Sequence, residues 1–240
     1  EINPNEYEYL INELSKKGVQ ILILNNRKPA IWDKNSLRII RKYNCKILGL
    51  EELLSKEDKR NILEFSEQIK QKIRLLRNYN EEIRHSFLFD GISFWDCIEK
   101  KLLEIFESRC EWYVLLINGV AKIIQNYNIK SIISFNVIGE TEKAVLGIND
   151  NIIPSIMLVH AFDNYSAESA RYDILSMYSL FNDKIAVWGD VQKEYLQKAH
   201  GIDNERIILS GSPRHDKFFR DKGMKNKQKN HSNHCNILYL

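Results

Sequence analysis

A strand–helix–strand pattern in the last quarter of the 240-residue chain constrains the fold most strongly. Residues 185–189 (IAVWG) form a short apolar run that stops at a glycine, and 207–211 (IILSG) form a second such run. Between the two runs, residues 190–200 have helical spacing, and 201–204 indicate a turn. Apolar strands joined by a helix pair in parallel within a sheet that is covered on both faces. The pattern therefore predicts an α/β fold.

The same alternation of helix and strand extends over most of the chain. Helical spacing predicts helices over 5–17, 34–43, 140–146 and 172–181, and apolar runs predict strands over 19–24, 45–48, 131–135 and 153–159. We therefore expect a Rossmann-like, largely parallel sheet with helices on both faces.

The region from residue 50 to residue 126 differs from the rest of the chain. Residues 50–78 predict a charged helix with one apolar stripe and a break near Ser55, residues 87–94 a loop, and 95–107 and 112–126 two helices. Packing against the core is the simpler explanation of the stripe, and a coiled coil with a partner is the alternative.

The predicted strands are each followed by a polar residue or a glycine. These residues are Asn136, His160, Gly189 and Gly211. In open parallel sheets, ligands bind beyond the carboxyl ends of the strands. If the four strands are neighbours, the four positions therefore line one crevice.

Charge is distributed unevenly along the chain, whose net charge is +3. The segment 217–234 holds six Lys and Arg residues against Asp221 alone, so the remainder of the chain is slightly acidic. A body of this charge argues against a nucleic-acid partner. The basic segment is typical of a solvated linker, and a patch that meets anionic lipid or a phosphate-bearing substrate is the alternative.

Known cofactor and metal motifs are missing from the sequence. There is no Gly-x-Gly-x-x-Gly, P-loop or His-Glu-x-x-His pattern, and no Gly-x-Ser-x-Gly elbow. The widely spaced Cys45, Cys97, Cys110 and Cys235 indicate buried free thiols in a reducing compartment. We expect no metal site, because His231, His234 and Cys235 have no partner pair of ligands.

Three pieces of the chain together resemble the amino-terminal half of GT-B glycosyltransferases, the superfamily that includes UDP-N-acetylglucosamine 2-epimerase-like enzymes. They are 134–140 (SFNVIGE), 153–160 (IPSIMLVH), and the pair 187–189 (VWG) with 210–216 (SGSPRHD). Surface-polysaccharide transferases and the glycerophosphotransferases of teichoic-acid synthesis have similar Gly-x-Pro-Arg-x-Asp endings. The resemblance covers residues 131–219.

The resemblance implies how this chain divides into domains. In such enzymes the amino-terminal domain holds the acceptor, and the carboxy-terminal domain holds the nucleotide of the donor. We therefore expect a Rossmann-like acceptor-side domain over 1–219, a basic linker over 220–235, and the start of a truncated donor-binding domain over 236–240. A chain with this organisation is expected to be inactive alone.

The resemblance also implies that His160 is catalytic. An imidazole titrates near neutral pH, so it can take the proton of an acceptor hydroxyl. Relatives usually have His-Gly at this point, whereas this chain has His160-Ala161, and alanine lacks the conformational freedom of glycine. A histidine that only hydrogen-bonds a loop backbone is the structural alternative.

The candidate substrate-binding residues follow the strand ends. The start of the helix at Glu140 suits a sugar hydroxyl or a phosphate, or else is simply capped. Arg214 can pair with a phosphate, or Asp216 can neutralise it. The full set is Asn136, Gly139, Glu140, Asp163, Gly189, Ser210, Gly211, Ser212, Arg214 and Asp216.

We expect the chain to take part in sugar transfer from a nucleotide-sugar donor to a surface glycan or glycolipid acceptor, without a cofactor. The alternatives are a 2-epimerase-like or glycerophosphotransferase-like enzyme and a non-catalytic glycan- or protein-binding domain. The expected location is cytoplasmic, with peripheral contact at the inner face of the membrane as a further option.

Overall fold

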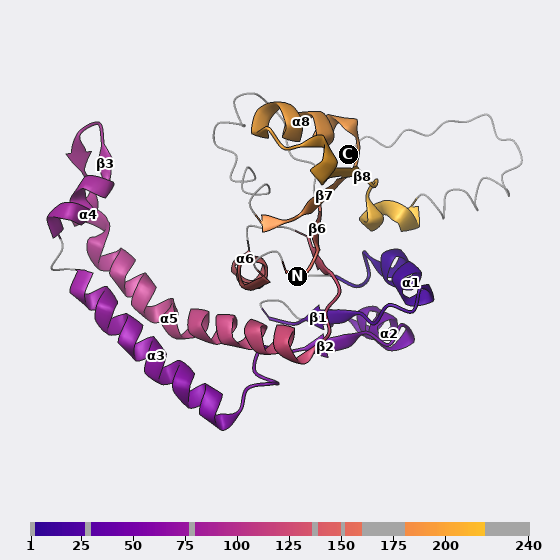
Figure 1. Ribbon diagram of the computed structural model, residues 1–240, viewed down its shortest axis with the longest axis horizontal. Coiled ribbons are helices and arrows are strands. Elements are labelled where there is room, and N and C mark those ends of the chain that lie inside the picture. Colours follow the sequence, from indigo (N-terminus) through magenta and orange to yellow (C-terminus); the bar gives the residue numbers. More distant parts are fainter. Residues whose placement is uncertain are drawn as a thin grey trace, which may run out of the picture.

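The predicted parallel sheet is present in the computed structural model, which describes residues 3–26, 30–76, 80–135, 139–149, 152–159 and 181–218. Its strands are β5 (Ile132–Ser134), β6 (Ser155–Leu158), β7 (Lys184–Val187) and β8 (Ile207–Leu209). They lie side by side in chain order, and each pairs in parallel with the next (Figure 1). The prediction that these four strands are adjacent and parallel is confirmed.

Seven helices are described in these parts of the chain. They are α1 (Glu8–Lys16), α2 (Lys34–Lys42), α3 (Lys56–Leu75), α4 (Asn80–Ser86), α5 (Trp95–Asn126), α6 (Glu140–Asn149) and α8 (Asp190–His200). The predicted helix 172–181, the basic linker 220–235 and the strand 236–240 lie outside the described residues, apart from Phe181.

Helices cover both faces of the four-stranded sheet. Leu158 and Ala186 pack in one core with side chains of α1 and α2. Met157 and Ile185, each one residue earlier in its strand, pack in a second core with side chains of α6 and α8. Because successive side chains of a strand point to opposite faces, continuous apolar strands require cover on both sides. This arrangement is compatible with a Rossmann-like fold.

The first two strands form a separate sheet. Strands β1 (Leu22–Leu24) and β2 (Lys46–Leu48) pair with each other in parallel. They share a hydrophobic core with the large sheet, in which the rings of Tyr7 and Phe135 lie 4.4 Å apart between centroids. Phe135 directly follows β5, so the first α/β unit packs close to the end of that strand.

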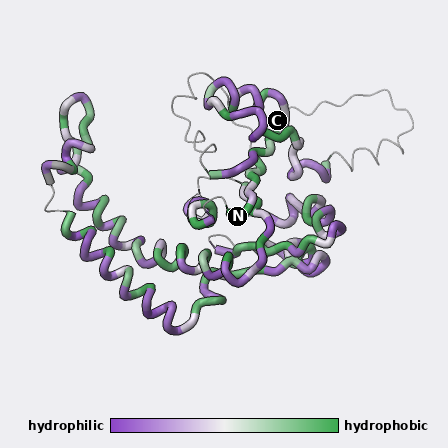
Figure 2. The backbone as a smooth tube through the Cα atoms, viewed as in Figure 1, coloured by the Kyte–Doolittle hydropathy of each residue, from purple (hydrophilic) through white to green (hydrophobic). Residues whose placement is uncertain are grey.

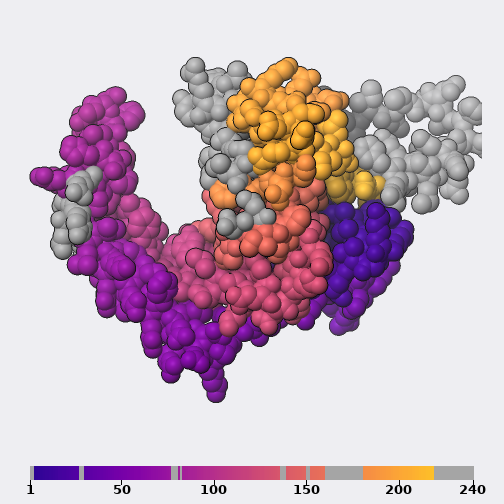
Figure 3. Space-filling view, viewed as in Figure 1, coloured from indigo at the N-terminus to yellow at the C-terminus, as the bar shows by residue number. Residues whose placement is uncertain are grey.

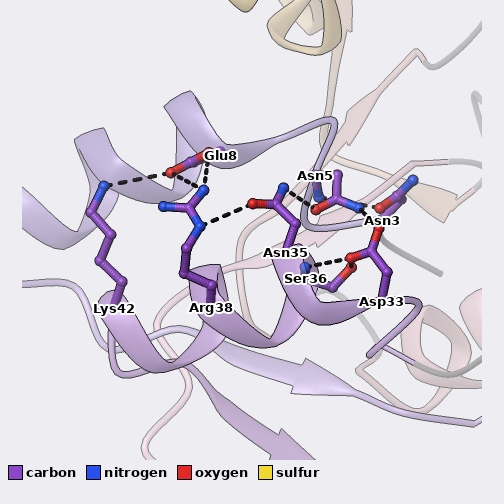
Figure 4. A network of polar contacts seen from close by, with 8 residues as sticks. All are labelled: Asn3, Asn5, Glu8, Asp33, Asn35, Ser36, Arg38 and Lys42. Carbon is purple, nitrogen blue, oxygen red and sulfur yellow. Dashed lines mark hydrogen bonds and ion pairs between the residues drawn. The ribbon is translucent and has the colours of Figure 1, made fainter.

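A polar network on the surface ties α1 to α2 (Figure 4). The Asn5 amide donates to the Asp33 carboxylate at 3.0 Å, and Asn35 donates to Asn5 at 2.6 Å. One turn further on, Arg38 pairs with Glu8 at 3.1 Å. Exposed contacts of this kind each add little stability, so the network fixes the orientation of the two helices more than it stabilises them.

Two predictions between residues 87 and 126 are wrong. The expected pair of helices is one helix, α5, of 32 residues. Its middle contains no Pro or Gly, and Cys110 is buried there against α3. The expected loop 87–94 contains a hairpin of β3 (Leu88–Phe89) and β4 (Ile92–Ser93). Asp90 and Gly91 both have positive φ, which suits a two-residue hairpin turn.

Helices α3 and α5 form a long antiparallel pair that projects from the sheet, with α4 and the β3–β4 hairpin at its far end (Figure 1). We call residues 56–126 the arm. Polar and apolar positions alternate along both helices, as an amphipathic pair requires (Figure 2). Figure 3 shows a hollow between the arm and the rest of the molecule. In the described part of the chain, none of the helices is long and apolar enough to cross a membrane.

A capping box begins α3, at the break that the sequence predicts. The backbone N–H of Asp58 donates to the Ser55 hydroxyl oxygen at 3.0 Å, and the Ser55 N–H donates to the Asp58 carboxylate at 2.9 Å. Lys122 of α5 lies 3.0 Å from the same carboxylate. The hydrogen bonds from Ser55 and the charge of Lys122 lower the pKa of Asp58 to about 2.

Replacing Ser55 by alanine should therefore raise the pKa of Asp58 toward its ordinary value of 3.8. A depressed carboxyl pKa stabilises the fold above pH 3.8, and this contribution is lost as the pH falls toward about 2. The Ser55→Ala protein should lose less stability across this window than the wild type. An NMR titration of the Asp58 carboxyl carbon measures the shift, and an unchanged pKa would contradict the assignment.

Gly119 allows the close approach of α5 to the loop before α3. A Cβ at this position would lie 2.6 Å from the backbone oxygen of Leu50, and backbone cannot move aside cheaply. Gly119→Ala should therefore destabilise the fold by about 2 kcal/mol or more, despite the better helix propensity of alanine. Gly147, on the exposed side of α6, meets nothing within 4 Å. Gly147→Ala is the matched control and should stabilise by up to about 1 kcal/mol in urea unfolding.

Candidate functional site

The carboxyl ends of β7 and β8 bring an aromatic ring, an imidazole and a hydroxyl together. The ring of Trp188, directly after β7, meets the ring of His215 edge-on, with 5.0 Å between centroids. His215 lies in a short turn after β8, and its Nδ1 is 2.8 Å from the Ser212 hydroxyl. Trp188 is partly buried, and His215 is exposed. The edge therefore presents one accessible imidazole beside an aromatic wall.

Trp188 is fixed by hydrogen bonds at both ends. Its indole N–H donates to the carbonyl oxygen of Val159 at 2.7 Å. Its backbone N–H donates to the side-chain oxygen of Gln192 at 2.7 Å, and Gln192 is only 1% exposed. These bonds hold the ends of β6 and β7 and the start of α8 in register. Trp188 therefore lies at the rim of the sheet and is only partly buried.

The turn after β8 is shaped by Gly211, whose φ of 71° is in the left-handed region. The N–H of Ser210 donates to the carbonyl oxygen of Val187 at 3.0 Å, and this continues the pairing of β8 with β7. Gly189 is different, because its φ of −171° is open to any residue. Glycine therefore has a conformational reason at Gly211 and none at Gly189.

Arg214, a candidate for binding phosphate, forms an ion pair with Glu6. Its Nε is 2.7 Å from one oxygen of Glu6, and its Nη2 is 3.2 Å from the other. This bidentate pair joins the turn after β8 to the segment before α1. Beside it, burial raises the pKa of Tyr7 to about 12, with a smaller rise from Glu6. The guanidinium stays partly exposed, so it is reachable from the edge.

A second polar group lies where the end of β1 meets the start of α6. The amide of Asn26 donates to the Thr141 hydroxyl at 2.7 Å, across 115 positions of sequence. Asn25, one residue earlier, accepts from the N–H of Ala30 at 2.8 Å and so closes the loop after β1. The chain turns toward β2 on one side of this point and toward β6 on the other. Because β1 and β5 belong to separate sheets, this contact joins the first α/β unit to the start of α6.

The carboxylate of Glu140 is held by α5. Arg109 pairs with one of its oxygens at 2.5 Å, and the hydroxyl of Tyr113 donates to the other at 2.5 Å. Gly139 permits a similarly close approach, because a Cβ there would overlap the buried carboxylate of Glu142. The structure thus gives Glu140 and Gly139 packing roles at the entry to α6. Asp216 is half-buried at the end of the turn after β8.

The remaining candidate residues, Asn136, His160 and Asp163, lie outside the described residues, as do His231, His234 and Cys235. Among the cysteines, Cys45 and Cys110 are buried, as expected, whereas Cys97 is exposed. In the described ranges, no group of three or more His, Cys, Asp or Glu residues could hold a metal ion.

The Asn26–Thr141 contact and the contacts of Arg109, Tyr113 and His215 were not predicted from the sequence. The spacing of Ser212 and His215 around Pro213 is a signal that could have been used, because this spacing favours a side-chain contact across one turn. The other contacts join residues far apart in the chain, and no local pattern marks them.

Comparison of the chain with protein-family models, curated proteins and solved structures finds no match. The likeness to GT-B glycosyltransferases therefore rests on the sequence motifs described above.

Replacing Trp188 by phenylalanine should keep the ring and remove the hydrogen bond to Val159. Val159 is 9% exposed, so its carbonyl would lose a partner where water is scarce, at a cost of about 1–2 kcal/mol. Trp112→Phe is the matched control, because Trp112 packs through its ring in the core between α5 and α6. Urea unfolding of both variants makes the measurement, and an equal loss in the two would contradict the role of the indole N–H.

Proposed function

We propose that this chain is the acceptor-side part of a glycosyltransferase, which moves a sugar from a nucleotide-sugar donor to a surface glycan or glycolipid. The observation that supports the proposal most is the group of Trp188, Ser212 and His215 at the carboxyl edge of the parallel sheet. Binding sites commonly combine an aromatic wall with a few converging polar groups, as this edge does.

The proposed reaction needs a base at this edge. His160 takes the proton of an acceptor hydroxyl, the hydroxyl oxygen bonds to the anomeric carbon of the donor sugar, and the nucleoside diphosphate leaves with the electrons of the broken C–O bond. In the chain His160 directly follows Val159, whose carbonyl oxygen accepts the hydrogen bond from Trp188. His215 and Ser212 then contribute by binding the sugar hydroxyls, and Arg214 by attracting a phosphate.

Two alternatives have different support. A 2-epimerase needs carboxylates that can handle a proton, but Glu140 is bonded by Arg109 and Tyr113, and Glu142 is buried. These contacts favour transfer over epimerisation. A non-catalytic binding domain is supported by the exposed apolar side chains of the arm, which are described below.

His160→Ala should lower the transfer rate by about 100-fold or more in the protein at its natural length, because a general base supplies that much. His200→Ala is the matched control, since His200 packs on Tyr195 at the far end of α8. Transfer from UDP- and CDP-sugars to glycan acceptors is measured, with and without acceptor. Full activity of the His160→Ala protein would remove the base assignment, and turnover without acceptor would identify an epimerase.

The 240-residue chain should bind nucleotide-sugars only weakly, because the proposal places most donor contacts on another domain. Calorimetric titration with UDP- and CDP-sugars tests this. A dissociation constant of about 1 μM or below would place the nucleotide site within these residues and would contradict the assignment of donor binding to another domain.

A further inference from the structure

Exposed apolar side chains are concentrated on the arm. Of the 21 large apolar residues exposed in the described ranges, 12 belong to residues 63–117. They are Leu63, Phe65, Leu75, Leu76, Leu88, Phe89, Ile92, Phe94, Ile105, Phe106, Tyr113 and Ile117. Such a concentration on a projecting element is typical of an interaction surface, whereas single exposed apolar residues are ordinary.

Part of this surface is a groove between α3 and α5. It has a volume of about 280 Å³, and its lining includes Phe65 and Ile69 of α3 and Phe106, Tyr113 and Ile117 of α5. Tyr113 also donates to Glu140 of α6, so the groove lies beside the contact between the arm and α6. It therefore offers an apolar recess near the middle of the arm.

The far end of the arm carries an apolar knob. Phe89 and Ile92 are direct partners across the β3–β4 hairpin, so their side chains share one face. They are 73% and 74% exposed, which is more than any other apolar residue of the arm. Phe87, just before β3, anchors the hairpin to the start of α5, because its ring lies 4.9 Å from the ring of Trp95 between centroids. The knob is thus held in place while its apolar face is open.

The charge of the arm favours a neutral partner. Residues 56–126 contain 12 Lys and Arg and 12 Asp and Glu, so the arm has no net charge. Several of these charges pair with each other, as Arg74 does with Glu67 and Glu107, and Arg84 with Asp96. A surface of this kind lacks the basic excess that draws proteins to anionic lipid or nucleic acid. It also meets no net repulsion from an identical arm.

We propose that two copies of this chain associate through their arms, with the knob of each copy seated in the groove of the other. About 17 residues separate the start of α5, beside the knob, from the middle of the groove, which is about 25 Å along the helix. A two-fold axis that crosses α5 midway between the knob and the groove brings each knob to the other groove at once. The same contact then occurs twice, and the assembly ends at two copies.

The size of the arm fits such a dimer. Along the length of α3, which is about 30 Å, the two packed helices present a face of about 600 Å² on each copy. Two such faces bury about 1,200 Å² in total, which reaches the lower end of the range for stable interfaces. The inference is independent of the proposed enzymatic function, since it uses no residue of the sheet edge.

Sedimentation velocity tests the dimer on the 240-residue chain. We expect a dimer, and we expect Ile92→Glu in the knob and Phe106→Glu in the groove each to weaken association by about 100-fold or more, because each buries a charge without a partner. Leu63→Glu is the matched control, since Leu63 is 53% exposed on α3 and does not line the groove. Circular dichroism establishes that all three variants fold. A wild-type chain that is monomeric at about 100 μM, or a variant pair of which only one dissociates, would overturn the proposal.

Cross-linking tests the arrangement of the two copies. In a chain with Cys97→Ser, Cys110→Ala and Cys235→Ser, one batch carries Ile92→Cys and another carries Ile117→Cys, and Cys110 is replaced because it lines the groove. A short bifunctional thiol reagent should join the two batches when mixed, and should join neither batch alone. Absence of the mixed product would overturn the knob-in-groove arrangement. A monomeric wild type that sediments with phosphatidylcholine vesicles, and loses this with Ile92→Glu, would assign the knob to a membrane and overturn the dimer.

Discussion

The packing of the second half of α5 against α6 and Leu50 is the contact on which the rest of the arrangement depends. Leu116 and Val120 are buried there, and Gly119 lets the helix backbone approach Leu50 closely. The same helix extends without interruption to the far end of the arm, so the position of the arm follows from this one contact. One turn or two before the packed region, Arg109 and Tyr113 reach Glu140 and fix the start of α6.

The sequence predicts the parts of this fold that follow from local periodicity. Continuous apolar runs correctly predict β6 and β7 as strands buried on both faces, because each run has the length of a strand and is bounded by turn residues. Helix α8 occupies the predicted range, and Gly201 ends it in the left-handed conformation, as a C-terminal glycine should. The parallel order of β5 to β8 follows from the alternation with helices.

Contacts between residues far apart in the chain explain which features could not be predicted from the sequence. The middle of α5 contains polar residues that weaken the apolar stripe, but Cys110 is buried against Ile62 of α3, and this packing extends one helix through the predicted gap. At the start of α6, Glu140 has a carboxylate that could bind a ligand. Its partners Tyr113 and Arg109 lie 27 and 31 positions earlier in the chain. The sequence can predict that a side chain follows the end of a strand. It cannot predict which distant residue that side chain will contact.

Tyr113 contacts both the groove of the arm and the entry to α6, through opposite ends of one side chain. Its ring lines the groove of the arm, and its hydroxyl donates to Glu140 at the entry to α6. Glu140 follows Gly139, where a Cβ would overlap the carboxylate of Glu142. Occupation of the groove and the geometry at the entry to α6 therefore depend on one side chain, because a shift of the Tyr113 ring also moves the hydroxyl that holds Glu140.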